Sequence, residues 1–319
     1  MILFTADWHI KLGQKNVPKE WAKARYRELF KQIHELESRC SLHIIGGDIF
    51  DRLPTMEELE VYFEFIANVS IPTIIYDGNH EATKKNETFL DYLTKATKLI
   101  NPKVKIVTET YRHEDLNFYI LPYADLHKKG SIEAIPKEFP LFTHVRGEIP
   151  PHVKPEVDLD RLNEFPVVFA GDLHAHSNTQ RNIVYPGSPL TTSFHRSEVN
   201  TGYILIDENK FHWKWYPFDL PQLIRKTVNN PEDMIATDYH HTIYELEGDI
   251  QDLAEAKNSD LLDKKVVKRS TEATLILEAE MTLQDELVEY FTYILELDDN
   301  KIQELIGTFN DYAPKVAME

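Results

Sequence analysis

Carboxylate and imidazole side chains follow several short apolar runs in this sequence. Asp7-Trp8-His9 follows the first run, Gly46-Gly47-Asp48-Ile49-Phe50-Asp51 the second and Gly78-Asn79-His80-Glu81 the third. Further along, Thr143-His144 ends another run, and Gly171-Asp172-Leu173-His174 follows a later one. Carboxylates and imidazoles with one amide suit Mn²⁺, Fe²⁺ or Zn²⁺ better than Ca²⁺. The set is large enough for two cations, which would lie about 3.5–4 Å apart and clamp a phosphate between them.

These motifs need a fold that brings together residues about 170 positions apart, as the strand ends of an α/β sheet can. The apolar runs are rich in β-branched residues and predict strands buried on both faces. The runs are Ile2–Thr5, His43–Ile45, Thr73–Tyr76, Phe118–Leu121, Leu141–Thr143 and Val167–Ala170. Helical periodicity lies between several of them, from Trp21 to Leu36 and from Leu59 to Ala67. Alternating strands and helices predict a layered α/β core, whose strand ends meet at one crevice.

Each motif alone has a plainer explanation. Asp-x-His is commonly a surface pair, Gly-Asp is usually a turn, and Gly-Asn-His-Glu could be a capped turn. Four motifs in a fixed order, each at the end of a predicted buried strand, favour one shared metal site. Asp48 is our choice for a ligand that bridges two cations, because a carboxylate has two oxygens.

The motifs Asp7-x-His9, Gly47-Asp48-x-x-Asp51, Gly78-Asn79-His80-Glu81 and Gly171-x-x-His174 resemble the signature of calcineurin-like metallophosphoesterases. Within that superfamily the chain most resembles SbcD-type nuclease subunits of double-strand-break repair. The segment Ile183–Leu190 supports this resemblance. The resemblance covers residues 1 to 206, and the compact length resembles versions carried by tailed bacteriophages.

The resemblance implies a ligand set for two divalent cations, with Mn²⁺ expected and Mg²⁺ as the alternative. One cation would be held by Asp7, His9, Asp48 and His174, and the other by Asp48, Asn79, His144 and Asp172. Asp172 departs from the histidine that is usual there. The assignment of His144 as a ligand depends on its order in the sequence and its place at a strand end. His176 and His195 are alternatives to it, each more typical of a loop or a supporting position.

His80 is implied as the catalytic residue, which stabilises or protonates the leaving oxygen. Asp51 and Glu81 would orient ligand imidazoles or neighbouring backbone. Arg52 could touch a phosphate, although a solvated salt bridge is the plainer interpretation.

The net charge of -18 argues against a nucleic-acid partner held by a broad basic face. The imbalance is concentrated in residues 220–319, which contain 22 acidic and 9 basic residues. Bound cations would offset Asp7, Asp48 and Asp172. Basic residues near the motifs are Lys11, Lys15, Lys84, Lys85, Arg181 and Arg196, and the cluster Lys264-Lys265-x-x-Lys268-Arg269 is a candidate for phosphate-backbone contact.

The predicted fold is a four-layer α/β/β/α sandwich of two mixed sheets, with a small α+β capping domain and a helical C-terminal tail. A β-hairpin is expected at Gly202–Trp215, and Pro217 and Pro221 bracket a boundary. The domains would be 1–220 (nuclease), 221–280 (capping) and 281–319 (tail). The capping domain would contain a strand at Thr242–Leu246, a helix at Asp249–Leu262 and a strand at Thr274–Leu277.

The tail carries two apolar stripes at helical spacing, after a cap formed by Thr282 with Asp285 and before Pro314. The stripes could pack back on the core or dock on another protein. The resemblance implies that residues 281–319 dock on the coiled coil of a large SbcC-like ATPase. It also implies a homodimer through the first domain.

Three functions compete. The first is an ATP-regulated DNA nuclease subunit, with double-strand exonuclease and single-strand or hairpin endonuclease activity in repair or recombination. The second is a phosphatase of phosphoproteins or nucleotides, and the third a scaffold without turnover. The retained His80 argues against the scaffold. The sequence has no apolar run long enough to span a membrane, and its single cysteine, Cys40, fits a reducing cytoplasm, that of the host if the gene is phage-borne.

Overall fold

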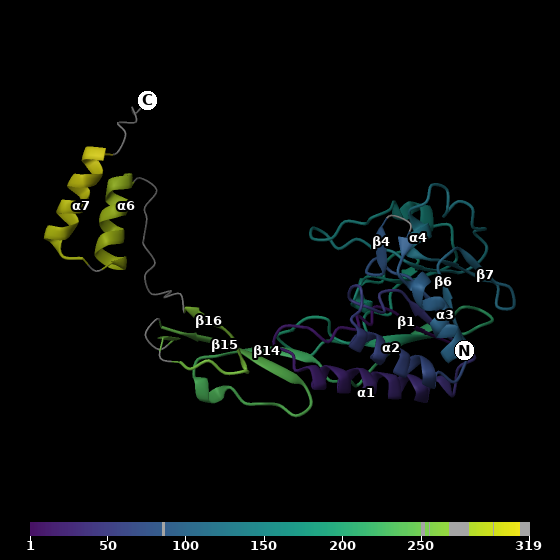
Figure 1. The fold of residues 1–319 in the computed structure, drawn as a ribbon. Helices are drawn as coiled ribbons and strands as arrows, with labels where there is room; N and C mark the ends of the chain where they lie inside the picture. Colours follow the sequence, from purple (N-terminus) through teal and green to yellow (C-terminus); the bar gives the residue numbers. More distant parts are fainter. Residues whose placement is uncertain (85–86, 250–252, 255, 268–280, 296, 313–319) are drawn as a thin grey trace. The chain divides into compact units, whose positions relative to one another are not determined.

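A computed structural model describes the chain except for residues 85–86, 250–252, 255, 268–280, 296 and 313–319 (Figure 1). The chain forms two compact units. One comprises Met1–Leu246 with Ala256–Lys265, and the other Glu247–Glu255 with Val266–Glu319. The division into 1–220, 221–280 and 281–319 stays a prediction.

A six-stranded sheet supplies three of the motif-bearing strand ends. Its order is β13-β12-β1-β2-β3-β6. The four strands β1, β2, β3 and β6 are parallel, and β12 and β13 add an antiparallel hairpin at the edge. The strands are β1 (Ile2–Thr5), β2 (Leu42–Gly46), β3 (Thr73–Tyr76), β6 (Val104–Val107), β12 (Gly202–Ile206) and β13 (Trp213–Pro217). The hairpin expected at Gly202–Trp215 is therefore confirmed.

A second sheet has five strands in the order β11-β10-β9-β8-β7. The strands from β8 to β11 are parallel, and β7 is antiparallel to β8. They are β7 (Tyr111–His113), β8 (Phe118–Leu121), β9 (Leu141–His144), β10 (Val168–Gly171) and β11 (Ile183–Val184). All six apolar runs that predicted strands coincide with strands of these two sheets, with Val167 one residue outside β10.

The two sheets pack face to face, and apolar side chains fill three layers around them. Phe4, Phe142 and Phe169 are buried between the sheets. Helices α1 (Lys19–Glu37), α2 (Met56–Asn68) and α3 (Leu90–Ile100) cover the first sheet (Figure 1), where Trp8 and Phe65 are fully buried. The second sheet is covered by short helices and loops, including α4 (Tyr123–Leu126) and the 3-10 helix η1 (Leu159–Leu162). The four-layer α/β prediction is confirmed, and its outermost layer is thin.

Some elements escaped prediction. Helix α3 and strands β6 and β7 were not predicted, nor was the small hairpin of β4 (Ala82–Lys84) and β5 (Glu87–Thr88). Helix α3 packs Leu90 and Leu93 against the core but leaves Tyr92 86% and Leu99 76% exposed. Helix α2 begins at Met56, three residues before the predicted periodicity, where Thr55 and Glu58 form a capping box.

A three-stranded sheet follows, with β15 (His241–Gly248) between β14 (Leu223–Val228) and β16 (Leu262–Val267). The 3-10 helix η3 (Pro231–Asp233) lies between β14 and β15. The helix predicted over Asp249–Leu262 is wrong in its second half: residues 256–261 are irregular or turn, and Leu262 begins a strand. Asn258, Ser259 and Asp260 favour turns over helix interiors, which explains the break. The strand predicted at Thr274–Leu277 lies outside the described residues.

In the second unit, the tail forms α6 (Leu283–Glu289), a π-helical turn η4 (Tyr290–Ile294) and α7 (Asp299–Tyr312). Thr282 and Asp285 form the predicted cap. Ile302 and Ile306 of α7 are buried, whereas Leu283 and Tyr293 are 61% and 64% exposed. Pro314 lies outside the described residues. Among the helices that the structure describes, none has the length and apolar character needed to cross a bilayer.

Candidate metal centre

The predicted ligands lie at the carboxyl ends of parallel strands in both sheets. Asp7 follows β1, Asp48 follows β2, Asn79 follows β3, His144 ends β9 and Asp172 follows β10. The fold thus brings together all five strand ends that the sequence singled out, as expected for strand ends that share one crevice.

The backbone is strained where it presents these side chains. Asp7, His9, Asp48 and Asp172 have φ of 58°, 46°, 51° and 102°, a region that non-glycine residues seldom occupy. The neighbouring loop leaves no room for a side chain at Gly78, because a Cβ there would lie 2.2 Å from Asp48 Oδ1. Glycine is therefore required at this close approach.

One group of donors comprises Asp7, His9 and His174, whose ligand atoms lie within 4.8 Å of one another. The Nε2 atoms of His9 and His174 are 3.0 Å apart. Asp48 Oδ2 lies 3.7 Å from His9 Nε2, which places this carboxylate beside the group.

A second group surrounds His144. Its Nε2 lies 3.0 Å from Asn79 Oδ1, 3.4 Å from Asp48 Oδ2 and 3.9 Å from Asp172 Oδ1. Ligands bound at about 2.1 Å are separated by about 3.0 Å at right angles and about 3.4 Å at a tetrahedral angle. The spacing therefore fits a cation, and Asp48 Oδ2 faces both groups.

Hydrogen bonds prepare two imidazoles to act as ligands. His144 Nδ1 is 2.9 Å from the Gly46 carbonyl oxygen, which can accept a hydrogen bond from Nδ1–H, so in the neutral ring Nε2 carries the lone pair that a cation needs. His174 Nδ1 lies 3.1 Å from the hydroxyl of Thr192. The Asn79 amide differs from the imidazoles, because no hydrogen bond favours its orientation: Oδ1 faces only acceptors, and a turned-over amide would donate to Asp48 Oδ2 and to Asp172 Oδ1, each at 3.2 Å. The orientation with oxygen inward is the one that a cation requires.

Buried carboxylates favour the binding of cations at this site. Burial raises the pKa of Asp7 well above its usual range, and the Asp48 and Asp172 carboxylates add to this effect. Burial lowers the pKa of His9 to about 3, so its imidazole is neutral and available as a ligand. Burial acts to lower the pKa of His144, but the carboxylates of Asp48 and Asp7 outweigh it and raise that pKa well above its usual range. A divalent cation can replace the proton that these carboxylates attract.

Glu81 holds the backbone of the loops that carry Asp48 and Asn79. Its buried carboxylate accepts hydrogen bonds from the backbone N–H groups of Asp48, Phe50 and Gly78, at 2.9, 2.9 and 2.8 Å. Asp51 contacts the site more loosely, with Oδ1 at 3.8 Å from His9 Nδ1 and Oδ2 at 2.8 Å from Lys11.

His80 lies at the mouth of the site. Its side chain is 37% exposed, and its Nε2 is 3.9 Å from Asp48 Oδ2. Its backbone N–H donates to Asp48 Oδ1 at 2.9 Å, and its Nδ1 lies 2.5 Å from the carbonyl oxygen of Asp51. With Nδ1 so engaged, Nε2 faces the space in front of the carboxylates. His80 also falls within a third group of possible ligands, with His9 and Asp48.

The two alternative histidines lie apart from these groups. His176 stacks on Trp215 at 5.2 Å, and the backbone of His195 pairs with Ile224 of β14. Arg52 forms an ion pair with Glu58 at 3.2 Å, in keeping with the salt-bridge interpretation.

Two residues of the site were not predicted. Arg146 forms two parallel hydrogen bonds with the Asp172 carboxylate, at 3.1 and 3.0 Å. Thr192 contacts His174 and belongs to a loop that continues into the three-stranded sheet, where His195 N–H donates to the Leu223 carbonyl. Arg146 follows His144 by two residues, and that proximity was the available signal.

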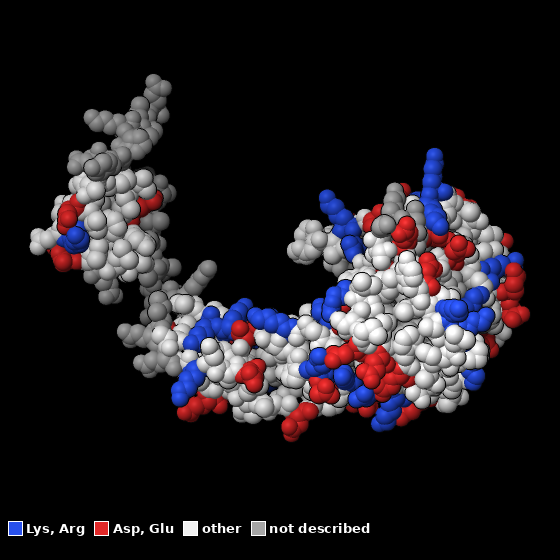
Figure 2. Space-filling model, viewed as in Figure 1, with Lys and Arg blue, Asp and Glu red and all other residues white. Residues whose placement is uncertain are grey.

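A basic surface lies on the three-stranded sheet, where Figure 2 shows lysine and arginine side chains gathered. Glu245 is buried there and pairs with Arg196 at 2.5 Å and Lys264 at 2.7 Å, and Arg225 pairs with Asp263 at 2.8 Å. Lys15, 84% exposed, lies 4.0 Å from Asp263. Arg181 forms an ion pair with Asp160. Lys85 and the side chain of Lys84 are not among the parts of the chain that the structure describes.

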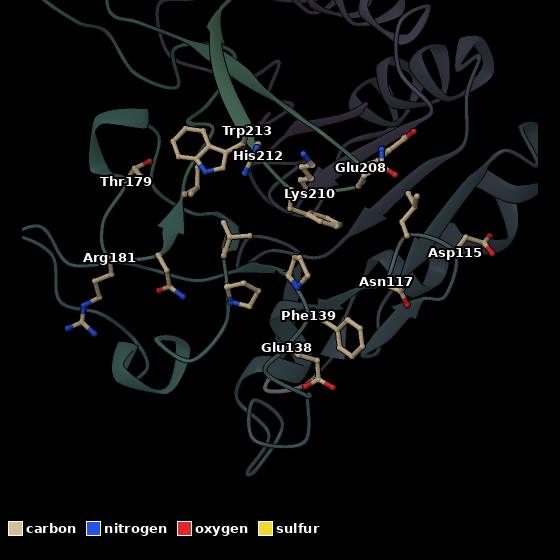
Figure 3. Close-up of a pocket in the computed structure, with 18 residues that line it drawn as sticks. Asp115, Asn117, Glu138, Phe139, Thr179, Arg181, Glu208, Lys210, His212 and Trp213 are labelled. Carbon is tan, nitrogen blue, oxygen red and sulfur yellow. The ribbon is translucent and has the colours of Figure 1, made fainter.

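A cavity of about 1030 Å³ lies at the opposite, amino ends of the second sheet's strands. Figure 3 shows Trp213, Phe139, Arg181 and Glu138 among its lining residues. None of the predicted ligands lines this cavity, so it is separate from the carboxyl-end site.

Residues 1–165 match the family model described as calcineurin-like phosphoesterase. The chain belongs to this family and is a metal-dependent phosphoesterase, which confirms the family resemblance. It is 41% identical over 322 residues to a protein of Escherichia phage T5 named "Probable exonuclease subunit 1", with 98% of each chain covered. It is 26% identical to a protein of Invertebrate iridescent virus 6 whose name describes a phosphoesterase, covering 72% of this chain and 84% of the relative. A solved archaeal phosphodiesterase aligns with 68% of this chain and 99% of its own, at 13% identity and a TM-score of 0.36.

Proposed function

We propose that this chain is the nuclease subunit of an SbcCD-like, ATP-regulated repair or recombination complex that hydrolyses DNA phosphodiesters with two divalent cations. The observation that carries the proposal is the position of Asp48 Oδ2, 3.7 Å from His9 Nε2 and 3.4 Å from His144 Nε2. The full-length similarity to the phage T5 protein named as an exonuclease subunit supports DNA as the substrate. The expected activities are exonuclease on duplex ends and endonuclease on single strands or hairpins.

In this proposal, one cation is held by Asp7, His9, Asp48 and His174, and the other by Asp48, Asn79, His144 and Asp172. When bound, Mn²⁺, or Mg²⁺ as the alternative, would neutralise the phosphodiester and lower the pKa of the attacking water. His80 faces the same space with Nε2 and stabilises or protonates the leaving oxygen. Asp51 acts on His9, and Glu81 fixes the backbone of the Asp48 loop.

The acidic net charge is compatible with a DNA substrate if contacts are local. The basic surface around Glu245, formed by Arg196, Arg225, Lys264 and Lys15, offers side chains for the phosphate backbone. Within the proposed complex, the partner subunit would supply further contacts.

We propose two protein partners. The exposed apolar side chains of Leu283, Tyr290 and Tyr293 in the tail suit a helix-in-groove contact with the coiled coil of an SbcC-like ATPase. The exposed Tyr92 and Leu99 of α3, with Met56 at 80% exposure at the start of α2, suit a homodimer contact through the first domain. The single Cys40 fits the reducing cytoplasm of a host cell.

End-labelled linear DNA digested by the purified chain in Mn²⁺ tests the proposal. A His80→Asn variant should lose activity by about 10²–10⁴-fold and should still bind Mn²⁺. A His212→Asn variant is the matched control, because His212 lines the distant cavity. EDTA should abolish cleavage by the parent chain.

A phosphoprotein assayed in parallel tests the competing phosphatase. Turnover of the phosphoprotein without DNA cleavage would overturn the nuclease proposal and favour the phosphatase. If neither substrate turns over, the assay is repeated with the ATPase partner present. If the chain is still inactive on both substrates with the partner present, the result would favour a scaffold without turnover.

A further inference from the structure

Asp172 stands out among the proposed ligands because an arginine grips it. Arg146 Nε lies 3.1 Å from Asp172 Oδ2, and Arg146 Nη2 lies 3.0 Å from Asp172 Oδ1. The Asp172 side chain is 5% exposed, whereas that of Arg146 is 41% exposed. A guanidinium that meets both carboxylate oxygens in parallel forms the strongest type of side-chain ion pair.

The same carboxylate also faces the second group of ligands. Asp172 Oδ1 lies 3.9 Å from His144 Nε2, and the Asp172 backbone N–H donates to Asp7. Oδ1 is therefore shared between the guanidinium on one side and the cation position beside His144 and Asn79 on the other.

The negative charge of the neighbouring carboxylates explains why an arginine lies beside Asp172. The buried carboxylates of Asp7 and Asp48 and the nearly buried one of Asp172 repel one another. Arg146 offsets the charge on Asp172. Once a divalent cation binds, the guanidinium becomes a like charge next to that cation and competes for Oδ1.

We propose that Arg146 is a built-in counter-cation, a positioning residue that holds Asp172 in the metal-free site and competes with the second cation for it. This inference rests on the proposed two-cation site. Its consequence is a second site that binds its cation more weakly than the first. Asp172 and the arginine that grips it therefore form one functional pair.

The test is a Mn²⁺ titration of the full chain, in which free Mn²⁺ is followed by electron paramagnetic resonance without substrate. Arg146→Met should lower the Kd of the weaker site by about tenfold, since it removes a like charge and frees Oδ1. Arg146→Lys keeps the charge and loses the parallel hydrogen bonds, so its Kd should fall between those of the parent and Arg146→Met. Arg161→Met is the matched control, because Arg161 grips Glu133 with the same geometry, at 2.7 and 2.9 Å, away from the site.

The outcomes separate this inference from the function on which it rests. A parent chain that binds no Mn²⁺ would overturn the metal site and the inference together. Two sites in the parent with Kd values that Arg146→Met and Arg146→Lys leave within twofold would overturn the inference alone. Weaker Mn²⁺ binding in both variants would also overturn it, because Arg146 would then be orienting Asp172 for the cation and not competing with it.

Discussion

The Glu81 carboxylate lies directly behind Asp48, and its Oε2 accepts the Asp48 backbone N–H at 2.9 Å. The same oxygen accepts the N–H of Gly78 at 2.8 Å, and Oε1 accepts that of Phe50 at 2.9 Å. One buried side chain therefore fixes the backbone of two ligand loops at once.

Glu81→Gln should destabilise the fold and weaken the metal site. The amide would turn an NH₂ group toward backbone N–H donors, at a cost of about 2–4 kcal/mol in the free energy of unfolding. We expect Mn²⁺ affinity to fall by at least about tenfold. Urea unfolding and Mn²⁺ titration measure the two effects. Glu58→Gln is the control, because Glu58 accepts the N–H groups of Leu12 and Thr55 outside the ligand loops. Equal losses of Mn²⁺ affinity in both variants would contradict this role of Glu81.

Asp48→Asn should lower the number of Mn²⁺ ions bound per chain below two. Asparagine keeps the shape of the side chain but removes the charge that both donor groups share. Calorimetric titration measures the stoichiometry. Asp51→Asn should keep the stoichiometry and weaken binding by less than about tenfold, since Asp51 acts through His9. A reversal of this order would exchange the roles assigned to the two aspartates.

Thr192→Val should weaken Mn²⁺ binding by about tenfold, because it removes the hydroxyl that contacts His174 Nδ1 and so loosens the orientation of that ring. The valine side chain has nearly the same volume. Thr179→Val provides the comparison, because Thr179 contacts the ring of His176 at 3.4 Å, outside the donor groups. Indistinguishable Mn²⁺ affinities in the two variants would show that His174 does not need this contact.

Glu37 should make stability depend on pH. It is fully buried and accepts hydrogen bonds from the backbone and hydroxyl of Ser70 at 2.9 and 2.8 Å. Burial acts to raise the pKa of Glu37, but the rings of His34 and His43 and the Ser70 hydrogen bond outweigh it and hold that pKa well below its usual range. The carboxylate therefore stabilises the fold above its unfolded-state pKa of about 4.3, and this contribution is lost as the pH falls further.

The measurement is urea unfolding of the parent and a Glu37→Gln variant between pH 3 and pH 7. The difference in the free energy of unfolding should reach about 2 kcal/mol near pH 7 and shrink below pH 4. A difference that stays constant across this range would show that the charge of Glu37 contributes nothing.

The strand ends of the site could be predicted because parallel strands have a simple geometric rule. Asp48 and Asn79 follow apolar runs, and the carboxyl ends of such strands share one edge. Arg146 and Thr192 could not be found in this way. Each reaches the site from a loop, and no periodicity in the sequence fixes which loop side chain meets which ligand.

The fold shows the same division. Buried strands leave a continuous apolar run, so β1 and β10 were found from the sequence. Helix α3 turns Leu90 and Leu93 toward the core but exposes Tyr92 and Leu99, so only part of its apolar sequence marks the buried side. The second half of the helix predicted over Asp249–Leu262 is wrong, because local turn preferences at Asn258–Asp260 outweigh a loose apolar periodicity.

Asp7, His9, Asp48 and Asp172 hold their side chains in place from left-handed backbone conformations. Each such residue costs the fold about 1 kcal/mol or more, which glycine would recover. Glycine at any of the four positions would relieve this strain, but it would also remove a side chain that faces the candidate metal centre. The geometry of the centre and the thermal stability of the fold therefore oppose each other at these four residues.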